Sequence, residues 1–168
     1  MSHTDKKSSG ETKEYREGFW NDVIKPADFK SSNLNKDFIL KIHEIKKKIM
    51  TINQKTWIKY SRAMVLFGLP QPDIHCIHYM GSHHCIECGI DNGCAEYIIL
   101  HNGKKWIFPE GYFHYIEVHN VNPSIEFQKM ILEINLDNCT FPFEISDDTF
   151  QEMNMLRLLN GMKGLSYI

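Results

Sequence analysis

Two cysteines and two histidines near the middle of the chain have spacings that are typical of a metal site. Cys85 and Cys88 are separated by two residues, and His114 and His119 by four. Thiolate sulfur and imidazole nitrogen are the donors that Zn²⁺ prefers, and four of them complete a tetrahedral coordination sphere. The sequence therefore predicts one structural Zn²⁺ ion bound by Cys85, Cys88, His114 and His119.

The sequence leaves two further possibilities open for the cysteines and histidines of this region. One is a second metal site, although these residues follow no standard ligand spacing. Its candidates are His75, Cys76, His78, His83 and His84. The other is a disulfide between Cys85 and Cys88, which an oxidising compartment would favour over metal. Cys94 and Cys139 are more typical of small core residues.

The elements that must position the four ligands are a turn, a hairpin and a helix, in that order. Residues 95–100 and 104–108 have strand character, and the Asn102-Gly103 pair between them is a strong hairpin signal. Pro109 followed by Glu110 favours the start of a helix over residues 109–119, which carries both histidines. A cysteine turn, a hairpin and a ligand-bearing helix together predict a treble-clef-like, zinc-stapled unit.

Helices are expected on both sides of this unit. Apolar residues recur at three- and four-residue steps over 36–50, and further helical segments are expected over 54–67, 124–134 and 148–160. A short strand is expected after Pro142. The last helix is expected to begin at a Ser146 or Asp147 cap and to bury Phe150, Met153, Leu156 and Leu159.

The domain organisation follows from composition. Residues 1–17 are almost devoid of apolar side chains, which predicts a disordered leader. The rest of the chain, with 42% hydrophobic residues overall, has enough apolar side chains for one core. Residues 18–168 are therefore predicted to form a single α+β domain that contains a zinc-binding module over 79–123.

The motifs around the ligands resemble a family of small zinc-finger-like proteins. That family carries CxxCG, NGxxE and WPEGxxHYxxxHxVxP motifs in one order. The matching segments of this chain are 79–89, 92–96, 106–111, 114–115 and 119–123. The chain departs from the pattern by inserting Ile107-Phe108 between the tryptophan and the proline, which predicts a longer second strand. The resemblance covers residues 79–128 and implies the same four zinc ligands, but no activity.

Composition also bears on partners and location. The net charge of −2 gives no general attraction to nucleic acid. No segment approaches the roughly 18 to 20 apolar residues of a membrane span, and the N-terminus has no apolar signal-peptide core. The expectation is an intracellular, cytoplasmic protein that does not bind membranes.

Three function classes fit these features. The favoured one is a non-enzymatic zinc-binding protein, in which structural zinc stabilises a module that binds a protein partner. Four protein ligands leave zinc no open position for the water that catalysis requires. The second is a nucleic-acid-binding zinc finger. Binding there is expected to be weak, because the 109–119 helix carries no lysine or arginine and positive charge is left to Lys46–Lys48 and Lys104-Lys105.

The third class is a metal-dependent nuclease or hydrolase of the histidine-rich treble-clef type. His83-His84 would then supply a base beside a second metal, and Glu110 or Glu117 could serve a catalytic zinc as general base. The simpler interpretation makes Glu110 an N-terminal helix charge and Glu117 a solvent-facing helical residue.

Overall fold

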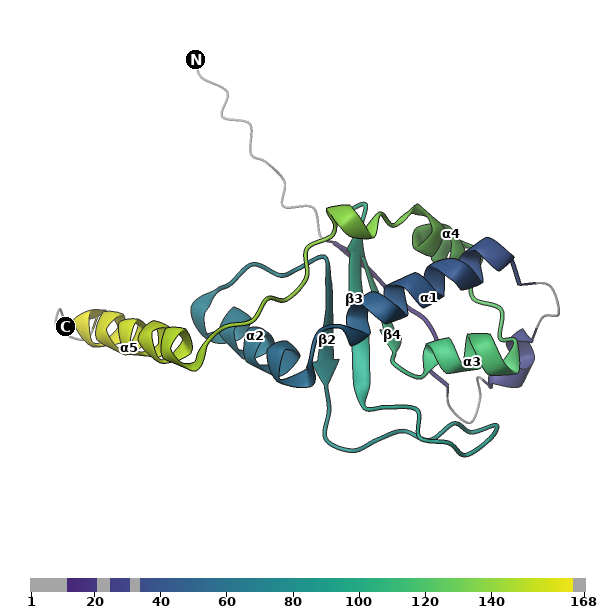
Figure 1. Cartoon of the computed structure of the whole chain (residues 1–168), viewed down its shortest axis with the longest axis horizontal. Helices are drawn as coiled ribbons and strands as arrows, with labels where there is room; N and C mark the ends of the chain where they lie inside the picture. Colours follow the sequence, from purple (N-terminus) through teal and green to yellow (C-terminus); the bar gives the residue numbers. More distant parts are fainter. Residues whose placement is uncertain (1–11, 21–24, 31–33, 165–168) are drawn as a thin grey trace, which may run out of the picture.

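A four-stranded sheet with the strand order β1-β4-β3-β2 forms the centre of the molecule. The computed structural model describes residues 12–20, 25–30 and 34–164 (Figure 1). The strands are β1 (Lys13–Arg16), β2 (Ile74–His78), β3 (Ala95–His101) and β4 (Lys104–Pro109). β1 is parallel to β4, and the other two strand pairs are antiparallel.

The helices are arranged around this sheet. They are α1 (Lys36–Met50), α2 (Gln54–Phe67), α3 (Tyr112–His119), α4 (Ile125–Glu133) and α5 (Asp147–Gly164). Short 3₁₀ turns occupy Pro26–Phe29 and Leu136–Asn138. α1 crosses one face of the sheet with α3 and α4 beside it, whereas α2 and α5 lie on the side of β2 (Figure 1). Helices packed on a mainly antiparallel sheet make the α+β fold that the sequence predicts.

Short polar side chains set the starts of the helices. Asn35, Asn53 and Ser124 each accept a hydrogen bond from a main-chain amide in the first turn of α1, α2 and α4, respectively. Ser146 does the same for α5, where its hydroxyl accepts from the amide of Thr149 at 3.1 Å. Each contact satisfies a donor that has no partner within the helix, and such caps typically contribute about 1 kcal/mol.

The β3–β4 hairpin confirms the turn predicted from Asn102-Gly103. His101 pairs directly with Lys104, so the loop has two residues. Asn102 and Gly103 both have positive φ, at 49° and 71°. Two successive positive φ angles define the turn whose twist matches that of antiparallel strands, and Asn-Gly is the sequence that adopts it most easily.

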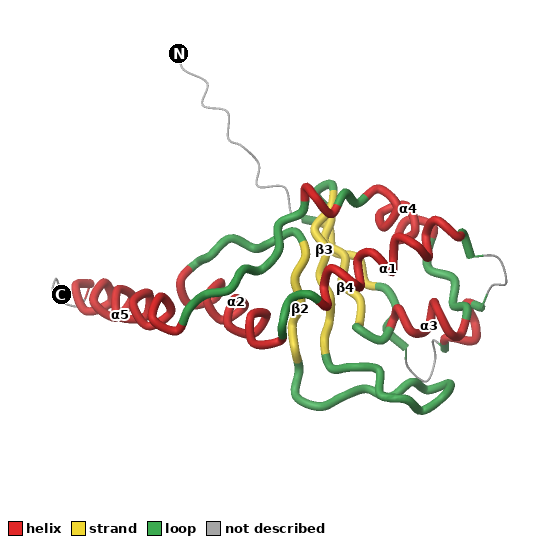
Figure 2. The backbone as a smooth tube through the Cα atoms, viewed as in Figure 1, coloured by secondary structure: helices red, strands yellow, loops and turns green. Residues whose placement is uncertain are grey.

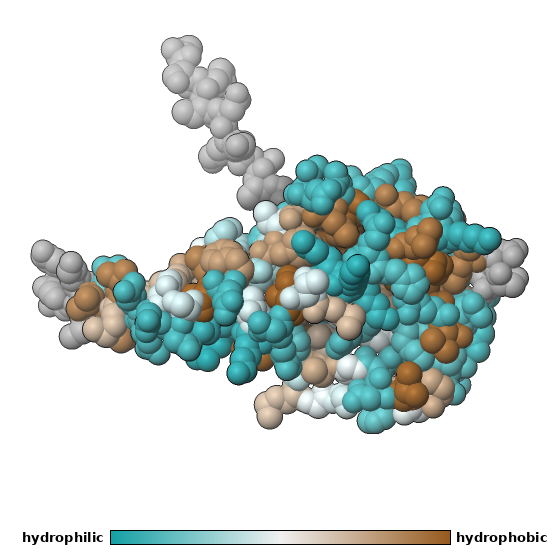
Figure 3. All heavy atoms as spheres, viewed as in Figure 1, coloured by the Kyte–Doolittle hydropathy of each residue, from teal (hydrophilic) through white to brown (hydrophobic). Residues whose placement is uncertain are grey.

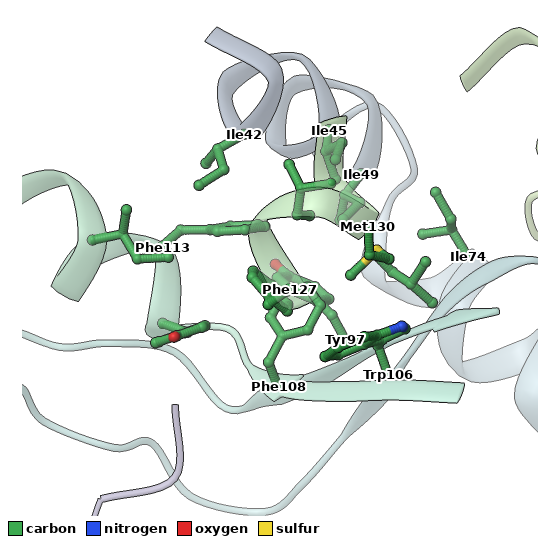
Figure 4. Close-up of a cluster of buried hydrophobic side chains, with 14 of the residues drawn as sticks. Ile42, Ile45, Ile49, Ile74, Tyr97, Trp106, Phe108, Phe113, Phe127 and Met130 are labelled. Atoms are coloured by element: carbon green, nitrogen blue, oxygen red, sulfur yellow. The ribbon is translucent and has the colours of Figure 1, made fainter. Parts of the chain in front are cut away.

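The core lies between α1 and the sheet face that carries Trp106 and Phe108 (Figure 4). Phe127 of α4 packs edge-on against both rings, with centroids 5.7 and 5.2 Å away. α1 contributes Phe38, Ile42, Ile45 and Ile49. Each fully buried large side chain contributes about 1.5–3 kcal/mol, so this cluster dominates the stability of the domain.

Two predictions, one for the N-terminal residues and one for the start of the histidine-bearing helix, are wrong. Residues 13–16, expected within a disordered leader, form β1 and extend the sheet through β4, while residues 1–11 lie outside the described residues. The helix expected from Pro109 begins only at Tyr112. Pro109 still belongs to β4, and the amide of Glu110 donates to the carbonyl of Ala95 at 2.8 Å, which prolongs the hairpin.

The C-terminal part also differs from expectation. No strand follows Pro142 in the described chain, because residues 142–146 run as an irregular connection to α5. α5 contacts α2 through Phe150, whose ring lies 5.2 Å from that of Phe67. Leu156 and Leu159 were predicted to be buried and are 60% and 50% exposed. Apolar side chains therefore remain on the surface of this projecting helix (Figure 3). No helix in the described residues is long and apolar enough to cross a membrane.

Candidate metal centre

The structure brings the four predicted ligands together. Their donor atoms all lie within 4.8 Å of one another. Sγ of Cys85 is 3.3 Å from Nε2 of His119, and Sγ of Cys88 is 3.3 Å from Nε2 of His114. Bonds of about 2.0–2.3 Å from a tetrahedral zinc place its ligand atoms roughly 3.3–3.8 Å apart. The four donor atoms are therefore close enough to hold a metal ion, and the two 3.3 Å separations match the lower end of this range.

The two thiols come from a tight turn in the long loop between β2 and β3, which extends towards α3 (Figure 2). The amide of Cys85 donates to the carbonyl of Ile90 at 2.8 Å, and the amide of Gly89 donates to the carbonyl of Cys85 at 2.7 Å. These two bonds fold residues 85–90 back on themselves. All five cysteines are free thiols, so the Cys85–Cys88 disulfide is not formed.

The base of this loop is fixed to the start of α3 by Glu110. Its carboxylate accepts hydrogen bonds from the amides of Cys94 at 3.0 Å and Ala95 at 3.3 Å. A Cβ at Gly93 would collide with this carboxylate, and φ of +89° at Gly93 also favours glycine. Glu110 therefore precedes α3 and stabilises the loop through these hydrogen bonds. It does not lie in the first turn of the helix, where the sequence placed it.

The two imidazoles come from α3, in which His119 is the last residue. Residues five apart on a helix point about 140° away from each other. The rings nevertheless converge, with their Nε2 atoms 3.1 Å apart and their planes at 83°. Asn120 follows with φ of +53° and ends the helix directly after the second ligand. The centre is thus assembled from one loop and the end of one helix.

The surroundings favour the protonation states that bind metal. Burial raises the pKa of the Cys85 thiol, but hydrogen bonds from the amides of Cys88 and Glu87 and from Tyr115 outweigh it and hold this pKa below its ordinary value. Burial, the neighbouring His119 and the charge of Lys46 lower the pKa of His114. Thiolate and neutral imidazole are the forms that coordinate zinc.

Tyr115 is a part of the centre that the ligand spacing does not point to. Its hydroxyl accepts a hydrogen bond from the amide of Ile86 at 2.9 Å and also lowers the pKa of the Cys85 thiol. The side chain is buried. In the sequence, only its position next to His114 connects Tyr115 with the ligands. That position does not predict a contact between the Tyr115 hydroxyl and a loop some thirty residues away.

Glu117 is not the solvent-facing residue that the sequence suggests. Its carboxylate lies 3.0 Å from Nζ of Lys46 and 3.5 Å from Nδ1 of His43, both on α1. Only 17% of this side chain is exposed. Glu117 therefore links α3 to α1. Both carboxylates considered as general bases, Glu110 and Glu117, thus make contacts within the protein that stabilise the fold.

The remaining histidines and cysteines do not gather into a second site. Among the described residues, the four ligands above are the only group of three or more potential ligands close enough to hold an ion. Sγ of Cys76 lies 3.6 Å from Nδ1 of His78, without a third partner. His75 and Cys76 are neighbours on β2 and point to opposite faces of the sheet. His83 and His84 lie exposed on the loop.

Comparison with known proteins adds no family or relative to this geometry. No family model, no curated protein and no solved structure matches the chain. The family resemblance inferred from the motifs and the treble-clef assignment therefore remain proposals.

Proposed function

We propose that this chain is a zinc-binding protein whose metal has a structural role and stabilises a module for binding another protein. The observation that carries the proposal is the convergence of Cys85, Cys88, His114 and His119 from two segments of the chain. The order of cysteine turn, hairpin and helix supports a treble-clef-like unit and the resemblance to small zinc-finger-like proteins.

A structural role follows from the ligand set. Four protein donors fill a tetrahedral zinc sphere and leave no position for a catalytic water. The two carboxylates considered as general bases, Glu110 and Glu117, are engaged by main-chain amides and by Lys46, respectively. A zinc ion would fasten the 85–90 turn to α3, a connection otherwise made chiefly by the Tyr115 hydroxyl.

A protein partner is favoured by the surface of the cysteine turn. Ile86 is 62% exposed and Ile90 is 50% exposed, and the two residues lie within the same short turn. Figure 3 shows apolar surface at the end of this loop. We propose these two apolar side chains, on a turn that a zinc ion would fix, as part of the surface that contacts the partner.

Zinc content of the purified chain tests the metal assignment. We expect close to one zinc per chain by elemental analysis, lost in Cys88→Ser together with the folding of the 79–123 module. Cys88 is the informative ligand because its side chain is exposed, so the substitution itself removes no core packing. Structural zinc contributes about 10–16 kcal/mol to folding in finger peptides at neutral pH, so the effect should be large.

Cys139→Ser is the matched control. Cys139 is half-buried, and its thiol donates to the carbonyl of Asn135 at 3.3 Å, a bond that a serine hydroxyl can also make. This variant should keep its zinc and its fold. Stoichiometric zinc in Cys88→Ser, or its equal loss from both variants, would overturn the assignment.

A further inference from the structure

A cavity of about 250 Å³ lies beside the metal centre. Its walls come from the N-terminal residues 18–20, from the loop between β2 and β3, from the start of β3 and from the turn between β4 and α3. Cavities that hold drug-sized ligands and cofactors run from about 300 to 1,000 Å³. This one is better matched to a single side chain than to a cofactor.

The walls carry aromatic, acidic and imidazole side chains. The aromatic members are Phe19, Trp20, Tyr79 and Tyr115, the acidic members are Glu96 and Glu110, and the imidazoles belong to His83 and His84. No lysine or arginine lies among the described residues that line it. Aromatic faces and carboxylates both attract cations, and a site partly shielded from water strengthens that attraction.

One guanidinium group of this chain, that of Arg16, already contacts two residues of the wall. The Arg16 guanidinium lies 4.4 Å from the centroid of the Phe19 ring, and its Nη2 atom is 3.6 Å from Oε1 of Glu96. The hydroxyl of Tyr79 donates to the other oxygen of Glu96 at 3.1 Å. Arg16 remains half exposed at the rim, with 51% of its side chain accessible.

We infer that this cavity receives an arginine side chain from a partner protein. The inference rests on the proposed function and names the chemistry that the partner must present. A guanidinium is planar and stacks on aromatic rings while it pairs with a carboxylate, which a lysine ammonium does less well. An incoming arginine would share Phe19 and Glu96 with Arg16, so the two guanidinium groups compete.

The cavity depends on the metal centre for one of its walls. Ile86 and Tyr115 both line it, and they are joined by the hydrogen bond from the Ile86 amide to the Tyr115 hydroxyl. Ile86 directly follows the ligand Cys85. Zinc would therefore hold the cavity in shape, and the binding test must use the zinc-loaded full chain.

The test is a titration of the zinc-loaded protein with four short peptides, acetyl-Gly-X-Gly-amide, in which X is arginine, lysine, norleucine or glutamate. Amide chemical shifts report both the affinity and the site. We expect the arginine peptide to bind most tightly and to shift resonances of residues 18–20, 79–86 and 92–96. Equal affinity of the four peptides, or shifts elsewhere, would overturn the inference.

Variants of the wall make the test specific. Glu96→Gln and Phe19→Leu should each weaken binding of the arginine peptide, about fivefold for the loss of the charge partner. Arg16→Gln should strengthen binding, because it removes the internal competitor. Glu144→Gln, an exposed carboxylate on the segment before α5, should bind as the wild type does.

Zinc content separates failure of this inference from failure of the proposed function. A protein with one zinc per chain that does not distinguish the arginine peptide, or in which Glu96→Gln binds as the wild type does, overturns the arginine site and leaves the metal assignment standing. A folded protein without zinc overturns the proposed function, and the arginine inference with it.

Discussion

At the scale of single residues, the candidate metal centre depends on a side chain that is not itself a ligand. The Tyr115 hydroxyl accepts a hydrogen bond from the amide of Ile86 and lowers the pKa of the Cys85 thiol, so one group positions the turn and favours the thiolate. Hydrogen bonds around metal ligands commonly change metal affinity by 10- to 100-fold. Tyr115 is therefore expected to contribute to zinc affinity as well as to stability.

Tyr115→Phe tests this contribution. Because the ring is retained, the variant should lose about 1 kcal/mol of unfolding free energy and bind zinc roughly tenfold more weakly. Chelator competition measures the affinity, and denaturant unfolding of the zinc-loaded protein measures the stability.

Tyr60→Phe is the control for a buried tyrosine hydroxyl away from the metal. Its hydroxyl donates to the carbonyl of Pro70 at 3.0 Å, and its loss should lower stability without changing zinc affinity. If both variants bind zinc as tightly as the wild type, Tyr115 has no role in the centre beyond packing.

At the scale of elements, β2 buries a titratable group on the sheet face opposite the core. His75 is 4% exposed, pairs with Ile98 and lies on the same face as Lys105. Its Nδ1 has no hydrogen-bond partner among the described residues. Burial, reinforced by the positive charge of Lys105, lowers the pKa of His75 to about 4. The strand is therefore stable only with a neutral imidazole at this position.

This burial predicts a pH dependence of stability. Since the pKa of His75 in the fold lies below the 6.5 of an exposed histidine, the unfolded chain binds more protons between these values. The free energy of unfolding should fall as the pH drops through this interval, by about 2 kcal/mol between pH 7 and pH 5. Denaturant unfolding at several pH values measures it.

His75→Phe should remove this part of the pH dependence. Release of zinc at low pH affects both proteins, so the difference between their unfolding free energies isolates His75. His83→Gln, which replaces an exposed histidine, should retain the wild-type profile. Parallel profiles for wild type and His75→Phe would show that the imidazole is not buried in its neutral form.

At the scale of the whole molecule, four of the five lysines in the Lys46–Lys48 and Lys104-Lys105 groups lie against a carboxylate or an aromatic ring. Lys46 pairs with Glu117 at 3.0 Å, and Lys105 pairs with Glu14 at 3.1 Å. The amines of Lys48 and Lys104 each lie 5.3 Å from the centroid of an aromatic ring. α3 carries no lysine or arginine. Of the two lysine groups, only Lys47 is therefore left to contact a phosphate without giving up a partner that the described residues provide.

This arrangement predicts weak and sequence-independent binding to duplex DNA. Each neutralised phosphate adds about 0.9 to the slope of log affinity against log salt concentration, so the slope should be about two or less. Fluorescence anisotropy at several salt concentrations measures it. Tight binding at physiological salt, with preference for one sequence, would favour a nucleic-acid-binding finger over a protein-binding module.

The sequence by itself determined those features that depend on residues close together in the chain. The helices over 36–50 and 54–67 have the predicted bounds, because Asn35 and Asn53 cap segments whose apolar residues already repeat with helical period. The hairpin follows from Asn102-Gly103 alone. The four candidate ligands could be named because the spacing within each pair is local and the donor chemistry is specific.

Only the tertiary structure decided what depends on distant segments. β1 contains few apolar residues and forms because β4 offers a free edge, which no local pattern reveals. Glu110, Glu117 and Tyr115 acquire their roles from partners far away in the chain. The three-residue spacing of Phe150, Met153, Leu156 and Leu159 predicts burial, yet only Phe150 packs against an α2 ring, and Leu156 and Leu159 are exposed. Local periodicity shows which face of a helix is apolar, whereas the packing of the whole chain decides whether anything covers it.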